Sequence, residues 1–210
     1  MVEKVNRVNG SRWIFFVIFF AVSLCSTPVI AGDNEGNDSP QAVFKLAQAA
    51  GAKKDFSALT KLVAPTERPM LALSTDMAVS MFVEFYEGEK APDLKKKYEE
   101  IQNKYGIASK DKEEGEKLHI TKDTPQEVID AHIRKRAKKL YGQVDAVMYV
   151  PDLMGIVVNM PEMADQAFFP KEKLSDLKID GDRATGKAGK KKISFIRENS
   201  RWYLAADAMD

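Results

Sequence analysis

The spacing of apolar residues changes near residue 170, and this change constrains the fold more than any other feature of the chain. Between about residues 39 and 165, apolar residues recur every three or four positions, which is typical of amphipathic helices. Short alternating runs follow, separated by Asp180-Gly181 and Asn199-Ser200, and they predict an antiparallel meander of three or four strands. We therefore expect an α+β fold, with N-terminal helices packed on a C-terminal antiparallel β-meander and an all-helical middle.

The first two helices have clear start signals. Ser39 and Pro40 supply an N-cap and a first helical residue, and Gly51 is expected to loosen or end this helix. Asp55 can cap a second, short helix that stops before Pro65.

The segment from Pro69 to Glu87 is the most apolar of the expected helices. Its main stripe has i, i+4 spacing and consists of Leu73, Met77, Met81 and Phe85. We expect this broad stripe to be deeply buried, with its methionines filling gaps in the core; a Met-rich binding groove is the alternative. Asp76 and Glu84 argue against a membrane span here.

Two charged helices follow. Residues 93–105 form one, with Gly106 suited to the position after its end. A charged loop is expected over 106–123. Thr124, Pro125 and Glu127 then form a capping-box start for a helix to about Tyr141, whose basic face is interpreted as solvated, with docking of phosphate-rich polymers or anionic lipid as the alternative.

Residues 143–160 are compatible with a helix or a strand. The run GIVVNM resembles a strand, whereas the apolar spacing after Pro151-Asp152 fits a helix. The length of the segment and the proline start favour the helix.

The N-terminus predicts export. Basic residues precede an apolar run over 13–25, and small residues lead to a cleavage site between Ala31 and Gly32. We interpret residues 1–31 as a signal peptide, 32–38 as a flexible spacer and 39–210 as a single domain. The expected location is periplasmic or extracellular, as in bacteria, with an uncleaved membrane anchor as the alternative.

Charge and cysteine content exclude several functions. The formal net charge is +1, which argues against non-specific nucleic-acid binding, and membrane contact is expected only through an uncleaved N-terminal segment. The single cysteine, Cys25, lies within the predicted signal peptide after Leu24, where bacterial lipoproteins have a small residue. Cleavage after Ala31 would therefore leave neither a disulfide nor a thiol nucleophile.

No catalytic, metal or cofactor site is predicted. The sequence lacks the usual phosphate-binding, dinucleotide-binding, serine-hydrolase, zincin and C-x-x-C motifs. Its two histidines, His119 and His132, do not have the spacing of a metal site.

Four residues are candidates for lining a ligand pocket. Asp145 and Asp152 flank an apolar stretch that includes Tyr149, where a carboxylate could have a raised pKa and act as a general base; helix capping explains them equally well. On the last strand, Trp202 and Leu204 are expected to cover the helices, so Tyr203 should point outward or into a pocket.

Several stretches resemble a known superfamily. The helix SPQAVFKLAQAA, the segment KDFSAL and the strands around GDRAT and ISFIRENSRWYL are similar to exported bacterial members of the superfamily named for nuclear transport factor two. The resemblance covers about residues 39–63 and 178–206. It implies a cone-shaped fold with a cavity between a curved sheet and the first helices, a design shared by isomerases, dehydratases and non-catalytic binding modules.

Two functions are therefore expected. The first is an exported non-catalytic binding or interaction module, whose partner is a small apolar ligand or an envelope protein. The alternative is a small cavity enzyme of isomerase or dehydratase type.

Overall fold

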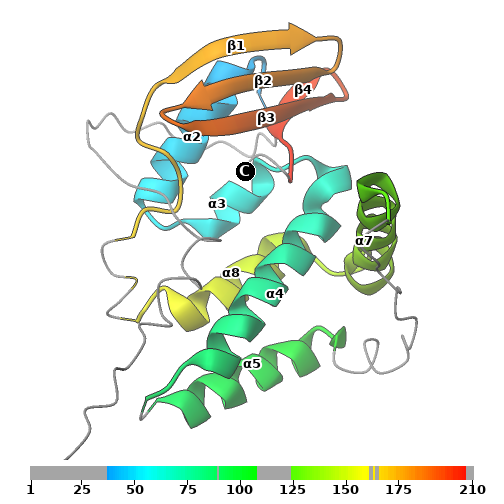
Figure 1. The fold of residues 1–210 in the computed structure, drawn as a ribbon. Helices are drawn as coiled ribbons and strands as arrows, with labels where there is room; N and C mark the ends of the chain where they lie inside the picture. Colours follow the sequence, from blue (N-terminus) through cyan, green and yellow to red (C-terminus); the bar gives the residue numbers. More distant parts are fainter. Residues whose placement is uncertain (1–36, 89, 108–123, 161–162, 164–165, 207–210) are drawn as a thin grey trace, which may run out of the picture.

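A computed structural model describes residues 37–88, 90–107, 124–160, 163 and 166–206 (Figure 1). The predicted signal peptide, its cleavage site at Ala31 and Gly32, residues 32–36 of the spacer and residues 108–123 of the charged loop lie outside the described residues. Asn37, which the sequence assigned to a flexible spacer, instead pairs with Trp202 through two backbone hydrogen bonds, so the spacer prediction is wrong at this residue. The described elements are α2 (Pro40–Ala52), α3 (Phe56–Lys61), the 3-10 helix η2 (Pro65–Glu67), α4 (Arg68–Phe85), α5 (Ala91–Lys104), α7 (Gln126–Tyr141), α8 (Ala146–Val157), β1 (Leu174–Asp180), β2 (Arg183–Ala188), β3 (Lys191–Glu198) and β4 (Arg201–Leu204). Helices precede an antiparallel sheet of order β1-β2-β3-β4, so the α+β prediction is confirmed.

The sheet lies at one end of the molecule with α2 against it, and the middle helices form the other end (Figure 1). Ile193 and Phe195 of β3 are 0% and 1% exposed, which confirms the predicted alternation along this strand. The turn from β3 to β4 consists of Asn199 and Ser200, whose φ angles of 49° and 66° suit a two-residue hairpin.

The predicted caps of the first two helices are confirmed. The Ser39 side chain accepts a hydrogen bond from the backbone N–H of Ala42 at 3.2 Å, and Asp55 accepts one from Ala58 at 2.9 Å. Gly51 does not interrupt α2, which ends one residue later.

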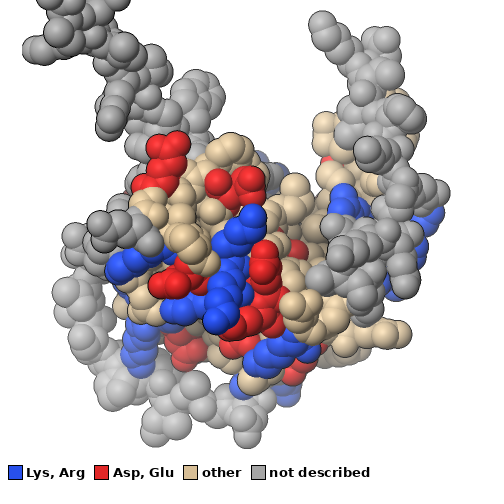
Figure 2. All heavy atoms as spheres, turned by 90° about the horizontal axis from the view of Figure 1, so that it is seen from below, with Lys and Arg blue, Asp and Glu red and all other residues tan. Residues whose placement is uncertain are grey.

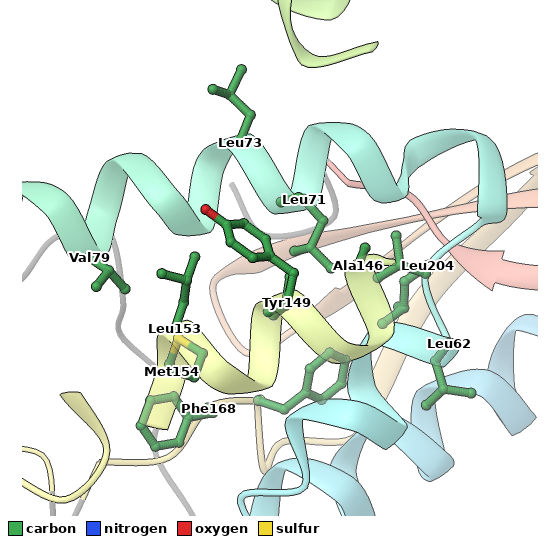
Figure 3. Close-up of a cluster of buried hydrophobic side chains, with 14 of the residues drawn as sticks. Leu62, Leu71, Leu73, Val79, Ala146, Tyr149, Leu153, Met154, Phe168 and Leu204 are labelled. Atoms are coloured by element: carbon green, nitrogen blue, oxygen red, sulfur yellow. The ribbon is translucent and has the colours of Figure 1, made fainter. Parts of the chain in front are cut away.

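The ambiguous segment 143–160 contains the helix α8, as its length favoured. The expected start at Pro151 is wrong, because Asp145 is the N-cap and accepts from the Val147 N–H at 3.0 Å. Pro151 lies inside the helix. Helix α8 packs against α3, α4 and α5, and Figure 3 shows its buried side chains beneath α4. Its buried residues are Ala146, Tyr149, Val150, Leu153, Met154, Ile156 and Val157.

The expected burial of the α4 stripe is wrong for three of its four residues. Leu73 is 5% exposed, but Met77, Met81 and Phe85 are 56%, 49% and 61% exposed. The reason is that α7 and α8 pack against α4 on a different part of its broad apolar surface. The buried residues of α4 are Leu71, Ala72, Leu73, Asp76, Val79 and Val83.

The two charged helices form with one difference from expectation. Gly106 follows α5 with a φ of 68°, a conformation that favours glycine. Helix α7 begins at Gln126, and Pro125 takes the N-cap position without a side-chain hydrogen bond. The capping box predicted from Thr124 is therefore wrong. No helix in the described part of the chain is long and apolar enough to cross a membrane.

Candidate functional site

A buried carboxylate lies in the middle of α4. Asp76 is 8% exposed. Its Oδ1 accepts hydrogen bonds from the Tyr98 hydroxyl at 2.7 Å and from Nε2 of Gln102 at 2.6 Å, and its Oδ2 accepts one from the Tyr141 hydroxyl. A buried carboxylate is costly unless donors surround it, so these three hydrogen bonds explain how α4 tolerates Asp76.

Tyr149 connects a further helix to this network. Nε2 of Gln102 also donates to the Tyr149 hydroxyl at 2.9 Å. Tyr149 is 0% exposed, and its hydroxyl points toward α4 (Figure 3). We call these five residues, Asp76, Tyr98, Gln102, Tyr141 and Tyr149, the Asp76 cluster. The cluster joins α4, α5, α7 and α8.

Local sequence spacing explains how the cluster assembles. Tyr98 and Gln102 are four residues apart on α5, so both side chains lie on one face of that helix. Tyr141 is the last residue of α7, and only a short connection separates it from Tyr149 on α8. Three segments thus present their polar groups to one position on α4.

Burial dominates the electrostatics of the cluster. It raises the pKa of Asp76 above the ordinary value of 3.8, although the hydrogen bonds from Tyr141, Tyr98 and Gln102 oppose this shift. Burial, together with the nearby carboxylate, also raises the pKa of Tyr141 and of Tyr149. Both phenols therefore stay protonated at neutral pH; the Tyr141 hydroxyl donates to Asp76, and the Tyr149 hydroxyl accepts from Gln102.

A half-open cleft of about 740 Å³ adjoins the cluster between α4, α5 and α7, and we call it the α4–α5–α7 cleft. Part of the cluster forms its polar floor, and aliphatic side chains and exposed polar groups form the walls and rim. The lining residues are Leu73, Asp76, Met77, Ser80, Tyr98, Glu99, Gln102, Asn103, Ile107, Arg136, Leu140 and Tyr141.

A second, smaller groove of about 310 Å³ continues from this cleft along α4 and α5. The two share Ser80, Tyr98 and Glu99. Met81 and Phe85 line the groove, so the exposed stripe of α4 leads from the groove into the cleft. Figure 2 views the molecule from the α5 end, and basic and acidic residues lie interspersed on this face.

The four pocket residues predicted from the sequence are dispersed. Tyr149 belongs to the Asp76 cluster, but neither it nor the other three is among the residues that line the cleft. Asp145 caps α8 and is exposed. Tyr203 is 5% exposed and is buried together with Trp202 and Leu204, so the expectation that it points outward is wrong.

Asp152 is part of a separate ion pair. Its Oδ2 accepts hydrogen bonds from Nζ of Lys104 at 2.7 Å and from the Tyr105 hydroxyl at 2.8 Å. Partial burial acts to raise the pKa of Asp152, but these hydrogen bonds outweigh it and hold the pKa below the ordinary value. The expected raised pKa is therefore wrong for this residue, whereas burial does raise the pKa of Asp76.

The described residues contain no group of three or more histidine, cysteine, aspartate or glutamate side chains that could hold a metal ion. His132 is half-buried on α7, and His119 lies outside the described residues.

Sequence reasoning missed the role of Asp76. The available signal was its position, three residues after Leu73, which places a carboxylate next to the apolar stripe of a helix. Such a residue needs buried donors, and Tyr98 with Gln102 on the next helix could have supplied them. Tyr141, which lies 65 residues from Asp76 in sequence, carried no local signal.

Searches of protein-family models, curated proteins and solved structures found no match for this chain. The resemblance to the superfamily of nuclear transport factor two therefore stays a prediction. The described geometry is a cleft in the helical middle of an α+β fold, and the interpretation of its function depends on this geometry.

Proposed function

We propose that the protein is a non-catalytic binding module that holds a small molecule with an apolar body in the α4–α5–α7 cleft. The observation that carries this proposal is the arrangement of Asp76, whose two oxygens accept three hydrogen bonds from the protein itself. A carboxylate held in this way maintains the shape of the cleft.

Asp76 has little capacity left for proton transfer. An ionised carboxylate offers about four acceptor positions, and three are taken here. A general base must come within hydrogen-bond distance of the proton that it removes, and only 8% of Asp76 is exposed. A binding role is therefore better supported than a catalytic one.

The walls of the cleft suit an apolar ligand. Leu73, Met77, Ile107 and Leu140 line it, and Met77 is flexible and more than half exposed. Methionine adapts to ligands of different shape because its side chain is unbranched and polarizable. The volume of about 740 Å³ lies within the range of typical small-molecule sites.

The cellular setting follows from the N-terminal sequence. We expect the protein to be exported to the periplasm or beyond, with an uncleaved anchor as the alternative. An envelope protein that covers Met81 and Phe85 is the other expected type of partner.

The cavity implied by the superfamily resemblance would lie between sheet and helices, whereas the cleft proposed here lies in the helical middle.

One observation favours the alternative of an isomerase or dehydratase. Burial raises the pKa of Asp76, and such carboxyl groups act as general acids or bases in many enzymes. Under this alternative, a ligand would have to displace the hydroxyl of Tyr98 or Tyr141 from the carboxylate. Turnover of a bound ligand that is lost in Asp76→Asn, with binding retained, would favour the enzyme.

Native mass spectrometry of the exported protein tests the binding proposal. We expect a stoichiometric excess mass that disappears on denaturation. Ser80→Trp should remove it, because Ser80 lines both the cleft and the adjoining groove. Ser74→Trp is the matched control, since Ser74 is exposed on the same helix, also donates to a carbonyl three residues earlier and does not line the cleft. Excess mass that persists in Ser80→Trp, or that is absent from the unmodified protein, would contradict the proposal.

A further inference from the structure

The hydroxyl protons at the floor of the cleft all point to Asp76. A phenol has one proton to donate, and those of Tyr98 and Tyr141 are donated to the two oxygens of this carboxylate. Toward any other neighbour, both phenol oxygens act as acceptors. A ligand that approaches the floor therefore meets oxygen atoms whose protons are directed elsewhere.

Gln102 extends the same pattern. Its side-chain nitrogen has two protons, and it donates to Asp76 at 2.6 Å and to Tyr149 at 2.9 Å. The donor protons of Tyr98, Tyr141 and Gln102 are thus used within the Asp76 cluster. At the floor of the cleft, the cluster therefore presents hydrogen-bond acceptors to a ligand.

The charged residues that line the cleft also favour a ligand that donates hydrogen bonds and carries a positive charge. With Asp76 ionised, the lining includes two carboxylates, Asp76 and Glu99, and one cation, Arg136. Glu99 and Arg136 are exposed, whereas Asp76 is buried, so the charge of Asp76 is the least screened of the three. The net charge of the lining is negative and would attract a cation.

From these features we propose that the head group of the ligand is a protonated amine. Its N–H groups donate to the phenol oxygen of Tyr98, which is half-buried and lines the cleft, and its apolar body extends along Met77 and Met81 into the adjoining groove. This inference depends on the proposed binding function and names the chemical class of the ligand. Anionic and purely apolar ligands are expected to bind more weakly, because neither satisfies the acceptors.

Calorimetric titration with three matched probes tests the head group. The probes are octylamine, octan-1-ol and octanoate, each below the concentration at which it forms micelles, added to the exported protein at neutral pH. Octylamine is then protonated and octanoate ionised. We expect octylamine to bind at least about tenfold more tightly than octanoate and more tightly than octan-1-ol.

The three probes separate the two proposals. If octan-1-ol binds as tightly as octylamine, or octanoate more tightly than octylamine, the amine inference is overturned and the binding proposal stands. If none of the three binds, the amine inference is overturned, and the mass measurement described above decides the binding proposal independently.

Two exposed residues of α5 provide a matched pair of variants. Glu99→Gln should weaken octylamine binding by about 2- to 5-fold, the range of exposed ion pairs, and leave octan-1-ol binding unchanged. Glu100→Gln is the control, because Glu100 does not line the cleft and pairs with Lys96 at 3.9 Å. Equal effects of the two variants on octylamine would overturn the inference.

Discussion

The hydroxyl of Tyr141, at the end of α7, donates a hydrogen bond to Asp76 in the middle of α4. This contact joins residues that are 65 positions apart, and it fixes one wall of the cleft relative to another. Tyr98 and Gln102 of α5 donate to the opposite carboxylate oxygen. The position of three helices around the cleft therefore depends on one acidic side chain.

Replacing Asp76 should show how much stability this contact provides. Asp76→Ala leaves three donors without their acceptor, and we expect it to lower the free energy of unfolding by about 3 kcal/mol or more. Asp76→Asn keeps the shape and one acceptor oxygen, so its effect should be clearly smaller. Urea denaturation at neutral pH measures both. Equal losses in the two variants would show that the hydrogen bonds contribute little.

The stability difference between Asp76→Asn and the unmodified protein should depend on pH. A carboxyl group whose folded-state pKa is raised stabilises the protein below its unfolded pKa, here about 3.8, and this contribution is lost as pH rises through the folded-state pKa. The variant should therefore gain stability relative to the unmodified protein between pH 3 and pH 7. Urea denaturation at several pH values tests this. A relative loss with rising pH would mean that the donors outweigh burial and lower the pKa.

Replacing two helical glycines by alanine should change the free energy of unfolding in opposite directions. A Cβ atom at Gly51 would lie 2.7 Å from the Cβ of Phe169, and we expect a net loss of about 1–2 kcal/mol from overpacking. A Cβ atom at Gly155 meets nothing within 4 Å, so the better helix propensity of alanine should stabilise the protein by roughly 0.5–1 kcal/mol. Thermal or urea denaturation distinguishes the two. Stabilisation by Gly51→Ala would show that α2 and Phe169 pack less closely than described.

An exposed apolar residue of the groove and a buried one of the core should differ in the same assay. Met81 is 49% exposed, and Met81→Ala should change the free energy of unfolding by no more than about 0.5 kcal/mol. Leu153 of α8 is 0% exposed, and Leu153→Ala should lower the free energy of unfolding by about 2–5 kcal/mol. A large loss for Met81→Ala would indicate that the exposed stripe of α4 is covered in solution.

The helix starts and turns were largely predictable because their signals are local. Ser39 and Asp55 cap helices through neighbours three residues away, and Asn199-Ser200 fits a turn between adjacent strands. The start of helix α8 was predicted wrongly, because a proline such as Pro151 usually marks a helix start but here lies inside the helix.

The site could not be predicted in the same way. Periodicity predicted an apolar stripe on α4, but the packing of α7 and α8 determines which part is buried, so the burial of Met77 and Met81 was predicted wrongly. The partners of Asp76 come from three other segments, and such tertiary pairing is not encoded in local spacing. Asp145 and Asp152 were candidates because they flank an apolar run, but Asp145 caps α8 through Val147, and Asp152 pairs with Lys104, 48 positions away.

Both edges of the sheet are protected against the addition of another strand. The outer side of β4 is occupied by single bridges from Asn37 to Trp202 and from Val63 to Leu204. At the other edge, β1 is irregular between Ser175 and Lys178. Such features disfavour edge-to-edge aggregation, which begins on long regular edges. Folded copies at high concentration should therefore not extend one another's sheets into fibrils.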